Sequence, residues 1–298
     1  MSKSGDKKLF PSAHEDAAAS RRIVPTRQTE SPAYRLAFLD DEFILQDELR
    51  PIRLQLELLK PELLMQENAI ESTVVIFGSA RLKDRESAQN ELNRIKKQVR
   101  EDPSSALQKR LAAAERAVVN SRYYEEARQL AAIISENCQC EGRNTHVVIT
   151  GGGPGIMEAA NRGAHEAGAK SIGLNIVLPH EQAPNEYITP ELCFQFHYFA
   201  IRKMHFLIRA RALVAFPGGF GTLDELFEAL TLIQTMRIKS MPVLLFGREF
   251  WQRVVNFESL VEEGTISPED LDLFSYVETA QEAWTHIAGF NGLARKPE

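Results

Sequence analysis

The sequence predicts an α/β protein with a Rossmann-like, doubly wound parallel sheet, helices on both faces, and an N-terminal helical extension. From residue 72 onward, short β-branched runs alternate with longer amphipathic stretches. Glycine-rich loops follow three of these runs, after Phe77, Thr150 and Phe216. Because the carboxyl ends of parallel strands share one edge of a sheet, we expect all three loops at the edge where such sheets bind ligands.

Composition narrows the classes of partner. The 298 residues suffice for one large α/β domain with extensions, and the formal net charge of −6 disfavours nucleic acid and anionic membranes as partners. No apolar run approaches the roughly 20 residues of a membrane helix, and charges stand where a signal peptide has its apolar segment. A cytoplasmic protein is expected. The sparse cysteines Cys138, Cys140 and Cys193 lack the partners of a zinc site and are expected to be reduced thiols.

The chain is expected to divide into three parts. Residues 1–30 mix charges with small residues and show no apolar period, which predicts a disordered tail. Residues 31–71 carry leucines at mostly helical spacing, which predicts a helical extension broken at Pro51 and Pro61. We expect this extension to pack on the main domain or on a second subunit. Residues 72–291 are expected to form the nucleotide-binding catalytic domain.

Strands and helices should alternate within this main domain. A charged stretch at about 84–120 is interpreted as a solvated helical insertion, followed by a helix over 123–136. Later helices are expected to end near Ala167, to span about 199–209 and 226–236, and to cover 251–262. Strands are expected at 72–77, 146–150, 171–176, 212–216, 242–247 and 274–278.

The most informative stretch is Pro217-Gly-Gly-Phe-Gly-Thr-Leu-Asp-Glu225, which follows one expected strand and opens the next helix. Three glycines in four positions let a ligand approach the backbone closely. The helix start behind them offers unpaired N–H groups and a partial positive charge. This combination is typical of a phosphate site. The two acids that follow at once, Asp224 and Glu225, could also supply a base beside the phosphate.

A second glycine loop, Gly151-Gly-Gly-Pro-Gly155, also lies between a strand and a helix. It is not a dinucleotide fingerprint, because Ile156 stands where the third glycine would be. Neither loop ends in the Lys-Ser/Thr pair of an NTPase P-loop. A mononucleotide or sugar phosphate therefore fits better, with Gly152, Gly153 and Ser79 as candidate contacts. The alternative is that the glycines only form tight turns.

Glu225 has a second interpretation. Thr222 and Glu225 have the spacing of a capping box, in which the carboxylate would bond the backbone and do no chemistry. Spacing alone does not decide between a helix cap and a base.

Two neighbouring cations precede the strand that delivers the third glycine loop. Arg202 and Lys203 occupy adjacent helical positions about 100° apart, so only one of them can face the cleft. A surface salt bridge is the alternative for each. Glu181 lies in a loop after an expected strand and could reach the same cleft, or could be an ordinary solvated glutamate.

Together, the Gly151–Met157 loop, Arg202-Lys203 and the Pro217–Glu225 motif resemble the Lonely Guy family of phosphoribohydrolases, formerly called possible lysine decarboxylases. The resemblance covers about residues 72–290. The long N-terminal part and the Pro179-His-Glu-Gln182 stretch are similar to the longer, type II members. Phe199-Ala-Ile-Arg-Lys-Met-His-Phe206 departs from the motif of the short plant members.

The resemblance implies hydrolysis of the N-glycosidic bond of nucleoside 5′-monophosphates, with AMP and cytokinin riboside monophosphates as substrates. It implies catalysis by Glu225 and Arg202. The substrate-binding residues that it implies, together with their neighbours in the glycine loops, are Glu181, Lys203, Gly218, Gly219, Phe220, Gly221, Thr222, Thr231, Gly152, Gly153 and Ser79. A homo-oligomer, a dimer or larger, is expected, and the reaction requires no metal or organic cofactor.

Two other functions fit the same motifs. A non-catalytic nucleotide sensor or carrier would also use glycine loops at the sheet edge. A pyridoxal-phosphate lysine decarboxylase would need a Schiff-base lysine, for which Lys203 is the candidate.

Overall fold

The computed structural model describes residues 10–102, 104–139, 142–179 and 183–293. The chain divides into two compact units, Met1–Glu57 and Leu58–Glu298. The second unit contains the whole sheet and all three glycine loops, and it is the part that positions the candidate site.

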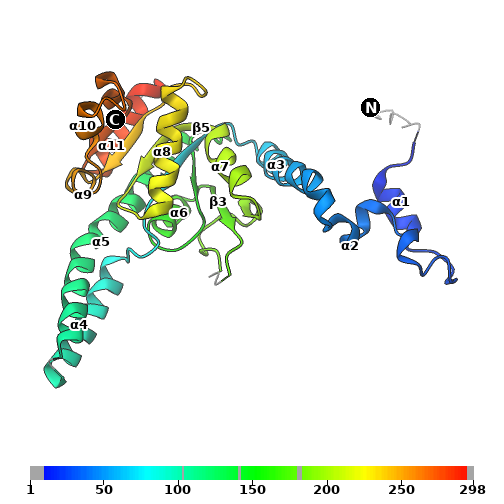
Figure 1. The fold of residues 1–298 in the computed structure, drawn as a ribbon, viewed down its shortest axis with the longest axis horizontal. Helices are drawn as coiled ribbons and strands as arrows, with labels where there is room; N and C mark the ends of the chain where they lie inside the picture. Colours follow the sequence, from blue (N-terminus) through cyan, green and yellow to red (C-terminus); the bar gives the residue numbers. More distant parts are fainter. Residues whose placement is uncertain (1–9, 103, 140–141, 180–182, 294–298) are drawn as a thin grey trace. The chain divides into compact units, whose positions relative to one another are not determined.

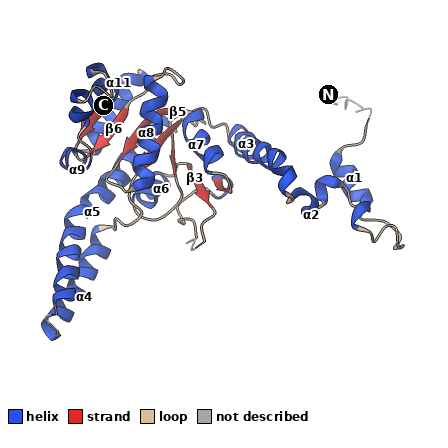
Figure 2. Cartoon of the chain, in the orientation of Figure 1, coloured by secondary structure: helices blue, strands red, loops and turns tan. Residues whose placement is uncertain are grey.

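A single parallel sheet forms the centre of the second unit (Figure 2). Its strand order is β4-β3-β2-β1-β5-β6-β7. The chain moves outward from β1 to β4 and then crosses back to β5, on the other side of β1. The topological switch point therefore lies between β1 and β5, where such sheets bind ligands. The strands are β1 Thr73–Phe77, β2 Val147–Thr150, β3 Ser171–Ile176, β4 Cys193–Phe196, β5 Ala210–Ala215, β6 Val243–Phe246 and β7 Ser275–Val277.

All six predicted strands are present, but β4 was not predicted. It has only four residues and follows a proline-containing segment, so its alternating pattern was too short to stand out. Phe194 and Phe196 are buried and Gln195 is exposed, as expected for an edge strand with one covered face.

Alternate residues of the central strands enter two hydrophobic cores on opposite faces of the sheet. Val75 and Phe77 of β1 face one core, and Val74 and Ile76 face the other. This confirms the doubly wound class. The first core contains residues of α7 Phe199–Ile208, α8 Phe220–Gln234, α9 Arg248–Val254 and α10 Phe257–Glu262. The second contains residues of α5 Ser105–Cys138, α6 Ile156–Glu166 and α11 Ala280–Asn291.

The charged stretch is helical, as expected, but the helix expected over 123–136 is the second half of α5 and not a separate helix. The charged stretch consists of α4 Arg85–Glu101 and the first half of α5, which lie side by side in Figure 1. A small apolar contact that includes Leu92, Ile95 and Ala114 joins the two helices. No proline or glycine stands between residues 105 and 138, so α5 continues for 34 residues and its second half covers the sheet.

The N-terminal region is more helical than predicted. The expected disordered tail contains α1 Ala13–Ser20, which starts with a Ser12–Glu15 capping box and buries none of its residues. Residues 1–9 lie outside the described residues. Short turns at Pro32–Tyr34, Ala37–Leu39 and Asp47–Leu49, together with α2 Asp41–Ile44, lead into α3 Arg50–Glu67.

The predicted breaks at Pro51 and Pro61 are wrong, because both prolines lie within α3. Pro51 is in the first turn, where its missing N–H would have no partner in any case. Pro61 is in the helix interior, and its ring is buried. Among the helices that the structure describes, none is long and apolar enough to cross a membrane.

Candidate active site

The three glycine loops meet at the switch point, where the backbone of Ser79 joins them. The Ser79 N–H donates to the Pro217 carbonyl at 3.0 Å, in the loop after β5. The Ser79 carbonyl accepts a bond of 3.1 Å from the N–H of Ile156, at the start of α6. The Ser79 hydroxyl accepts from the Arg81 N–H at 3.1 Å. The predicted meeting of the loops at one sheet edge is confirmed.

Helix α8 begins within the Pro217–Glu225 motif, three residues earlier than a capping box with Thr222 as the N-cap would require. Gly219 is the N-cap, and the helix start has no side-chain cap. Thr222 is the third residue of α8 and Glu225 the sixth, so the capping-box alternative is wrong. Because no side-chain carboxylate accepts their hydrogen bonds, the N–H groups of the first turn are available to an anion.

Space beside this helix start is left open by its glycines. A methyl group at Gly219 or Gly221 would meet nothing within 4 Å. The Phe220 side chain between them is 91% exposed. At Gly218, in contrast, a methyl group would lie 2.1 Å from the Thr222 hydroxyl. The loop is therefore packed at Gly218 and open at Gly219 and Gly221.

Glu225 lies one turn and a half into α8 and is only 8% exposed. Burial disfavours the charged carboxylate and raises the pKa of Glu225 to about 7, although the positive charges of Arg202 and Lys203 act in the opposite direction. A carboxyl group with a pKa near neutrality can both accept and return a proton at physiological pH.

Arg202 approaches the same region from α7. Its Nε donates to the carbonyl of Leu174, a residue of β3, at 2.7 Å. Its Nη2 lies 2.7 Å from the position that a methyl group on Gly151 would take, so a side chain at residue 151 would displace the guanidinium from its present position. Burial lowers the pKa of Arg202, against the effect of Glu225, but a guanidinium remains charged at neutral pH.

Lys203 points in another direction, as the predicted 100° offset requires. Its ammonium lies 3.0 Å from Asp224 and 3.1 Å from Glu228, both on α8. Burial acts to lower the pKa of Lys203, but the hydrogen bonds to these two acids outweigh it, and the pKa is raised. Lys203 is therefore held as a protonated ammonium that connects α7 to α8. Asp224, one of the two acids that could have supplied a base, is one of its partners.

The second glycine loop is fixed by side chains from several elements. The Gly152 N–H donates to the Thr150 hydroxyl at 3.0 Å, and the Gly152 and Gly153 carbonyls accept from the Asn185 amide at 3.1 and 3.0 Å. Gly152 has a φ of +75°, and a methyl group there would lie 2.3 Å from Asn175 Oδ1. The glycines of this loop are needed for close packing.

Two predicted substrate contacts are not placed beside Glu225. Glu181 lies outside the described residues. Thr231 is exposed, and its hydroxyl donates to the Phe227 carbonyl of its own helix at 2.7 Å. Thr231 instead lines a groove of about 470 Å³ along α8 with Phe220, Leu223, Asp224, Phe227, Glu228 and Leu232.

Sequence inspection missed three asparagines around the second glycine loop: Asn161, Asn175 and Asn185. Asn175 had a usable signal, since it is a polar residue inside the buried run of β3. Asn161 is the sixth residue of α6 and is fully buried, and Asn185 lies in a loop. Neither of these two stands out in the sequence without the fold.

Comparisons with known proteins agree with the motifs. The family model described as "Possible lysine decarboxylase" matches residues 157–287. The cytokinin riboside 5′-monophosphate phosphoribohydrolase LOG3 of Arabidopsis thaliana is 32% identical over 145 residues, 47% of this chain and 65% of that protein. Its relative LOG1, from the same plant, is 34% identical over 142 residues, 46% of this chain and 64% of that protein. The chain thus spans just under two thirds of the length of these relatives.

Solved structures align more loosely. The Moco carrier protein from Chlamydomonas reinhardtii aligns with a TM-score of 0.42 and 18% identity over 74% of this chain and 98% of that one. The molybdenum cofactor binding protein from Rippkaea orientalis aligns with a TM-score of 0.40 and 19% identity over 57% and 88%. At these scores nothing about function follows.

The span of the family match includes Arg202, Lys203 and the Pro217–Glu225 motif, and it begins after the Gly151–Gly155 loop. Together with the two plant relatives, it confirms the resemblance that the motifs predicted: this chain is similar to the Lonely Guy family of phosphoribohydrolases.

Proposed function

We propose that this protein hydrolyses the N-glycosidic bond of nucleoside 5′-monophosphates, namely AMP, cytokinin riboside 5′-monophosphates or both, to a free base and ribose 5-phosphate. The observation that carries the proposal is the buried carboxyl of Glu225, whose pKa is raised to about 7. It lies on the helix whose uncapped, glycine-lined start suits a phosphate. The similarity to named phosphoribohydrolases supports the same reaction.

The 5′-phosphate binds at the start of α8 in this proposal. The N–H groups of Phe220, Gly221 and Thr222 point out of the helix start, and the open space beside Gly219 and Gly221 admits the phosphate oxygens. Glu225 follows one turn later, so the phosphate site and the acid belong to one rigid element. Anchoring the phosphate positions the ribose, and such positioning can lower the barrier by several kcal/mol, up to roughly 7–11 in the best cases.

Glu225 acts at C1′ in its ionised form. As the C1′–N bond breaks, its electron pair moves to the leaving base and positive charge develops on the ribose ring. The carboxylate stabilises this charge and takes a proton from the water whose oxygen forms the new bond to C1′. The departing base takes up a proton, and Glu225 releases its own to solvent before the next turnover.

Arg202 serves to orient these groups. A guanidinium does not give up a proton at neutral pH, so Arg202 is not a general acid. Its bond to the Leu174 carbonyl fixes the Nε side of the group, which leaves its Nη groups for the ribose, the phosphate or Glu225. Its charge also lowers the pKa of Glu225 and so increases the ionised fraction at pH 7.

The test is release of adenine and ribose 5-phosphate from AMP, measured for the wild type, Glu225→Gln and Glu262→Gln. Glu225→Gln keeps the shape of the side chain and should reduce kcat by at least about 100-fold, the usual contribution of a general base. Glu262→Gln, an exposed position of α10, controls for the loss of one glutamate and should be unaffected. Running isopentenyladenosine monophosphate in parallel compares the two substrate classes.

The same assay covers the competing functions. No base release from any of a panel of monophosphates would leave a nucleotide sensor or carrier and would contradict the hydrolase. Turnover by Glu225→Gln within about threefold of the wild type would contradict the mechanism. Pyridoxal-phosphate decarboxylation is disfavoured because Lys203 is paired with Asp224 and Glu228, and a protonated ammonium is not a nucleophile.

A further inference from the structure

We propose that Asn185 is a positioning residue for this reaction: its amide holds the second glycine loop so that Gly151 stays against Arg202 and the Gly153 N–H stays available to the substrate. The proposal rests on the hydrolase function. The distances from Asn185 to the glycine loop carry it, together with the buried network that fixes the amide.

Asn185 makes a dense set of bonds for a residue on a loop. Its Nδ2 donates to the carbonyls of Gly152 and Gly153 at 3.1 and 3.0 Å, and it lies 3.0 Å from Asn161 Oδ1. Its backbone N–H donates to the Gly152 carbonyl at 2.9 Å. Its Oδ1 accepts from the Tyr187 N–H at 3.3 Å, which fixes which end of the amide faces the glycines.

Asn161 provides the fixed base for this arrangement. It is fully buried, its Oδ1 accepts from the Thr150 hydroxyl at 2.7 Å, and its Nδ2 donates to the Ser171 hydroxyl at 3.0 Å. The Thr150 hydroxyl in turn accepts from the Gly152 N–H. Gly152 is therefore held at its N–H through Thr150 and at its carbonyl through Asn185, and both side chains bond to the same Asn161 oxygen. A network satisfied in this way is rigid.

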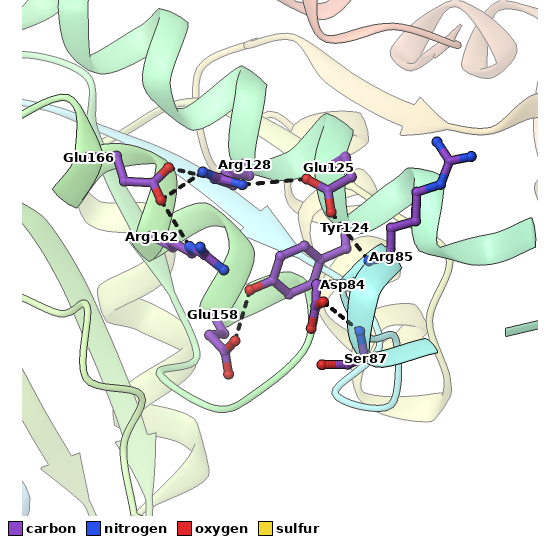
Figure 3. Close-up of polar contacts among 9 residues, drawn as sticks. All are labelled: Asp84, Arg85, Ser87, Tyr124, Glu125, Arg128, Glu158, Arg162 and Glu166. Atoms are coloured by element: carbon purple, nitrogen blue, oxygen red, sulfur yellow. Dashed lines mark hydrogen bonds and ion pairs between the residues drawn. The ribbon is translucent and has the colours of Figure 1, made fainter. Parts of the chain in front are cut away.

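Helix α6 carries Asn161, and other side chains of this helix form polar contacts that hold it in place (Figure 3). The Tyr124 hydroxyl donates to Glu158 at 2.8 Å, and Glu166 accepts from Arg128 at 2.8 Å and from Arg162 at 2.9 Å. The bonds from Tyr124 and Arg128 join α5 to α6, and the bond from Arg162 to Glu166 lies within α6. Asn161 consequently has little freedom to follow a movement of the loop, and Asn185 transmits that rigidity to the glycines.

The carbonyls of Gly152 and Gly153, which Asn185 holds, determine the orientation of the neighbouring backbone N–H groups. In a trans peptide the N–H is antiparallel to the carbonyl, so the Gly153 N–H points away from Asn185. Within the described part of the chain it has no hydrogen-bond partner. Gly151, one residue before Gly152, lies against the Arg202 guanidinium. A shift of the loop would therefore move the Gly153 N–H and change the packing against Arg202, whose charge acts on Glu225.

The test compares Asn185→Ala, Asn185→Asp and Asn137→Ala for AMP turnover. Asn137→Ala is the control, because it removes an asparagine-to-carbonyl bond of α5, to Ile133 at 2.7 Å, outside the site. Asn185→Ala should lower kcat by about tenfold or more, as misplaced reacting groups do, with a smaller change in KM. Asn137→Ala should remain close to the wild type.

Asn185→Asp distinguishes positioning from space filling. Aspartate has the same shape but replaces the donor with an oxygen that faces three other oxygens, so its loss of kcat should be at least as large as that of alanine. The rise of kcat/KM with pH should also move to higher pH in Asn185→Ala, by about half a unit, because Glu225 loses part of the influence of Arg202. Wild-type kcat in Asn185→Asp, or unchanged kcat and pH midpoint in Asn185→Ala, would overturn the proposal.

Hydrogen exchange tests the role of Asn185 independently of the proposed hydrolase function. If the wild type released no base from any monophosphate, the hydrolase would be wrong, and amide exchange in peptides covering residues 150–158 would decide the role of Asn185. Faster exchange in Asn185→Ala than in Asn137→Ala, at equal thermal stability, would support a held loop. Equal exchange in both variants would contradict it.

Discussion

The two glycine loops at the sheet edge look alike in sequence and differ in structure. Around Gly151–Gly155 the glycines are closely packed, against the Arg202 guanidinium, Asn175, Met157 and the backbone of Ser79. Around Gly218–Gly221 the second and third glycines face open space. One loop is thus filled by the protein, whereas the other leaves room for a ligand.

The difference shows that a glycine cluster after a strand carries two distinct meanings. Where backbone stands within 3 Å of the missing side chain, as at Gly155, glycine is a packing requirement. Where nothing stands there, glycine is not needed for the fold, and a ligand that approaches the backbone explains it better. Three substitutions, at Gly155, Glu225 and Gly221, test this contrast, from the largest expected effect to the smallest.

Gly155→Ala should destabilise the protein by about 3 kcal/mol. Its φ of +73° and ψ of −128° suit only glycine, and a methyl group would lie 2.3 Å from the Ser79 carbonyl, which is backbone and cannot rotate away. Gly168→Ala is the matched control, with a φ of +68° and nothing within 4 Å. Urea unfolding of both variants measures the packing contribution, and equal losses would mean that the contact is irrelevant.

Glu225→Gln should stabilise the protein at pH 8 while reducing kcat by at least about 100-fold. The folded pKa of Glu225 is about 7, above its usual 4.5, so between these values the folded state keeps a proton that the unfolded state has lost. Stability is therefore lost as the pH rises through this window, by an amount on the order of 2–3 kcal/mol for a group this buried. The gain from Glu225→Gln should grow from pH 4.5 to 7 and disappear below it, as urea unfolding at several pH values would show.

A gain in stability that did not depend on pH would contradict the burial argument for Glu225. A group that the fold keeps at a cost in stability is usually there for function. A gain independent of pH would remove this argument for Glu225, the acid beside the open loop.

Gly221→Ala should have the smallest effect on stability and the opposite sign to Gly155→Ala. In the first turn of α8, with nothing nearby, alanine should stabilise by about 0.5 kcal/mol. Its methyl group would occupy the proposed phosphate space, so AMP affinity, measured by titration calorimetry, should fall. Unchanged affinity would place the phosphate elsewhere.

Much of the fold followed from local patterns. The β-branched runs at 72–77 and 146–150 indicated buried strands because both faces of a parallel sheet are covered, and the glycines after them marked the ligand edge. The short edge strand β4 and the continuity of α5 did not follow. A four-residue alternating pattern is too brief to identify, and the end of a charged helix depends on what packs against it.

The sequence predicted which types of residue the candidate site contains, but not which contacts these residues make. Adjacent positions fixed that Arg202 and Lys203 would diverge, but not that Arg202 would bond the Leu174 carbonyl while Lys203 joined Asp224 and Glu228. Asn185 could not be found, because its acceptors lie about 32 residues earlier in the chain.

The sequence by itself determined the parallel α/β sheet, the three glycine loops at its edge and the family resemblance, because strand period, glycine placement and motif spacing are local properties of the chain. The tertiary structure alone decided that α8 begins at Phe220 and that Glu225 is a buried acid rather than a helix cap. It also decided which glycine loop is filled and which is open. These depend on desolvation and on contacts between segments distant in sequence, which no local pattern encodes.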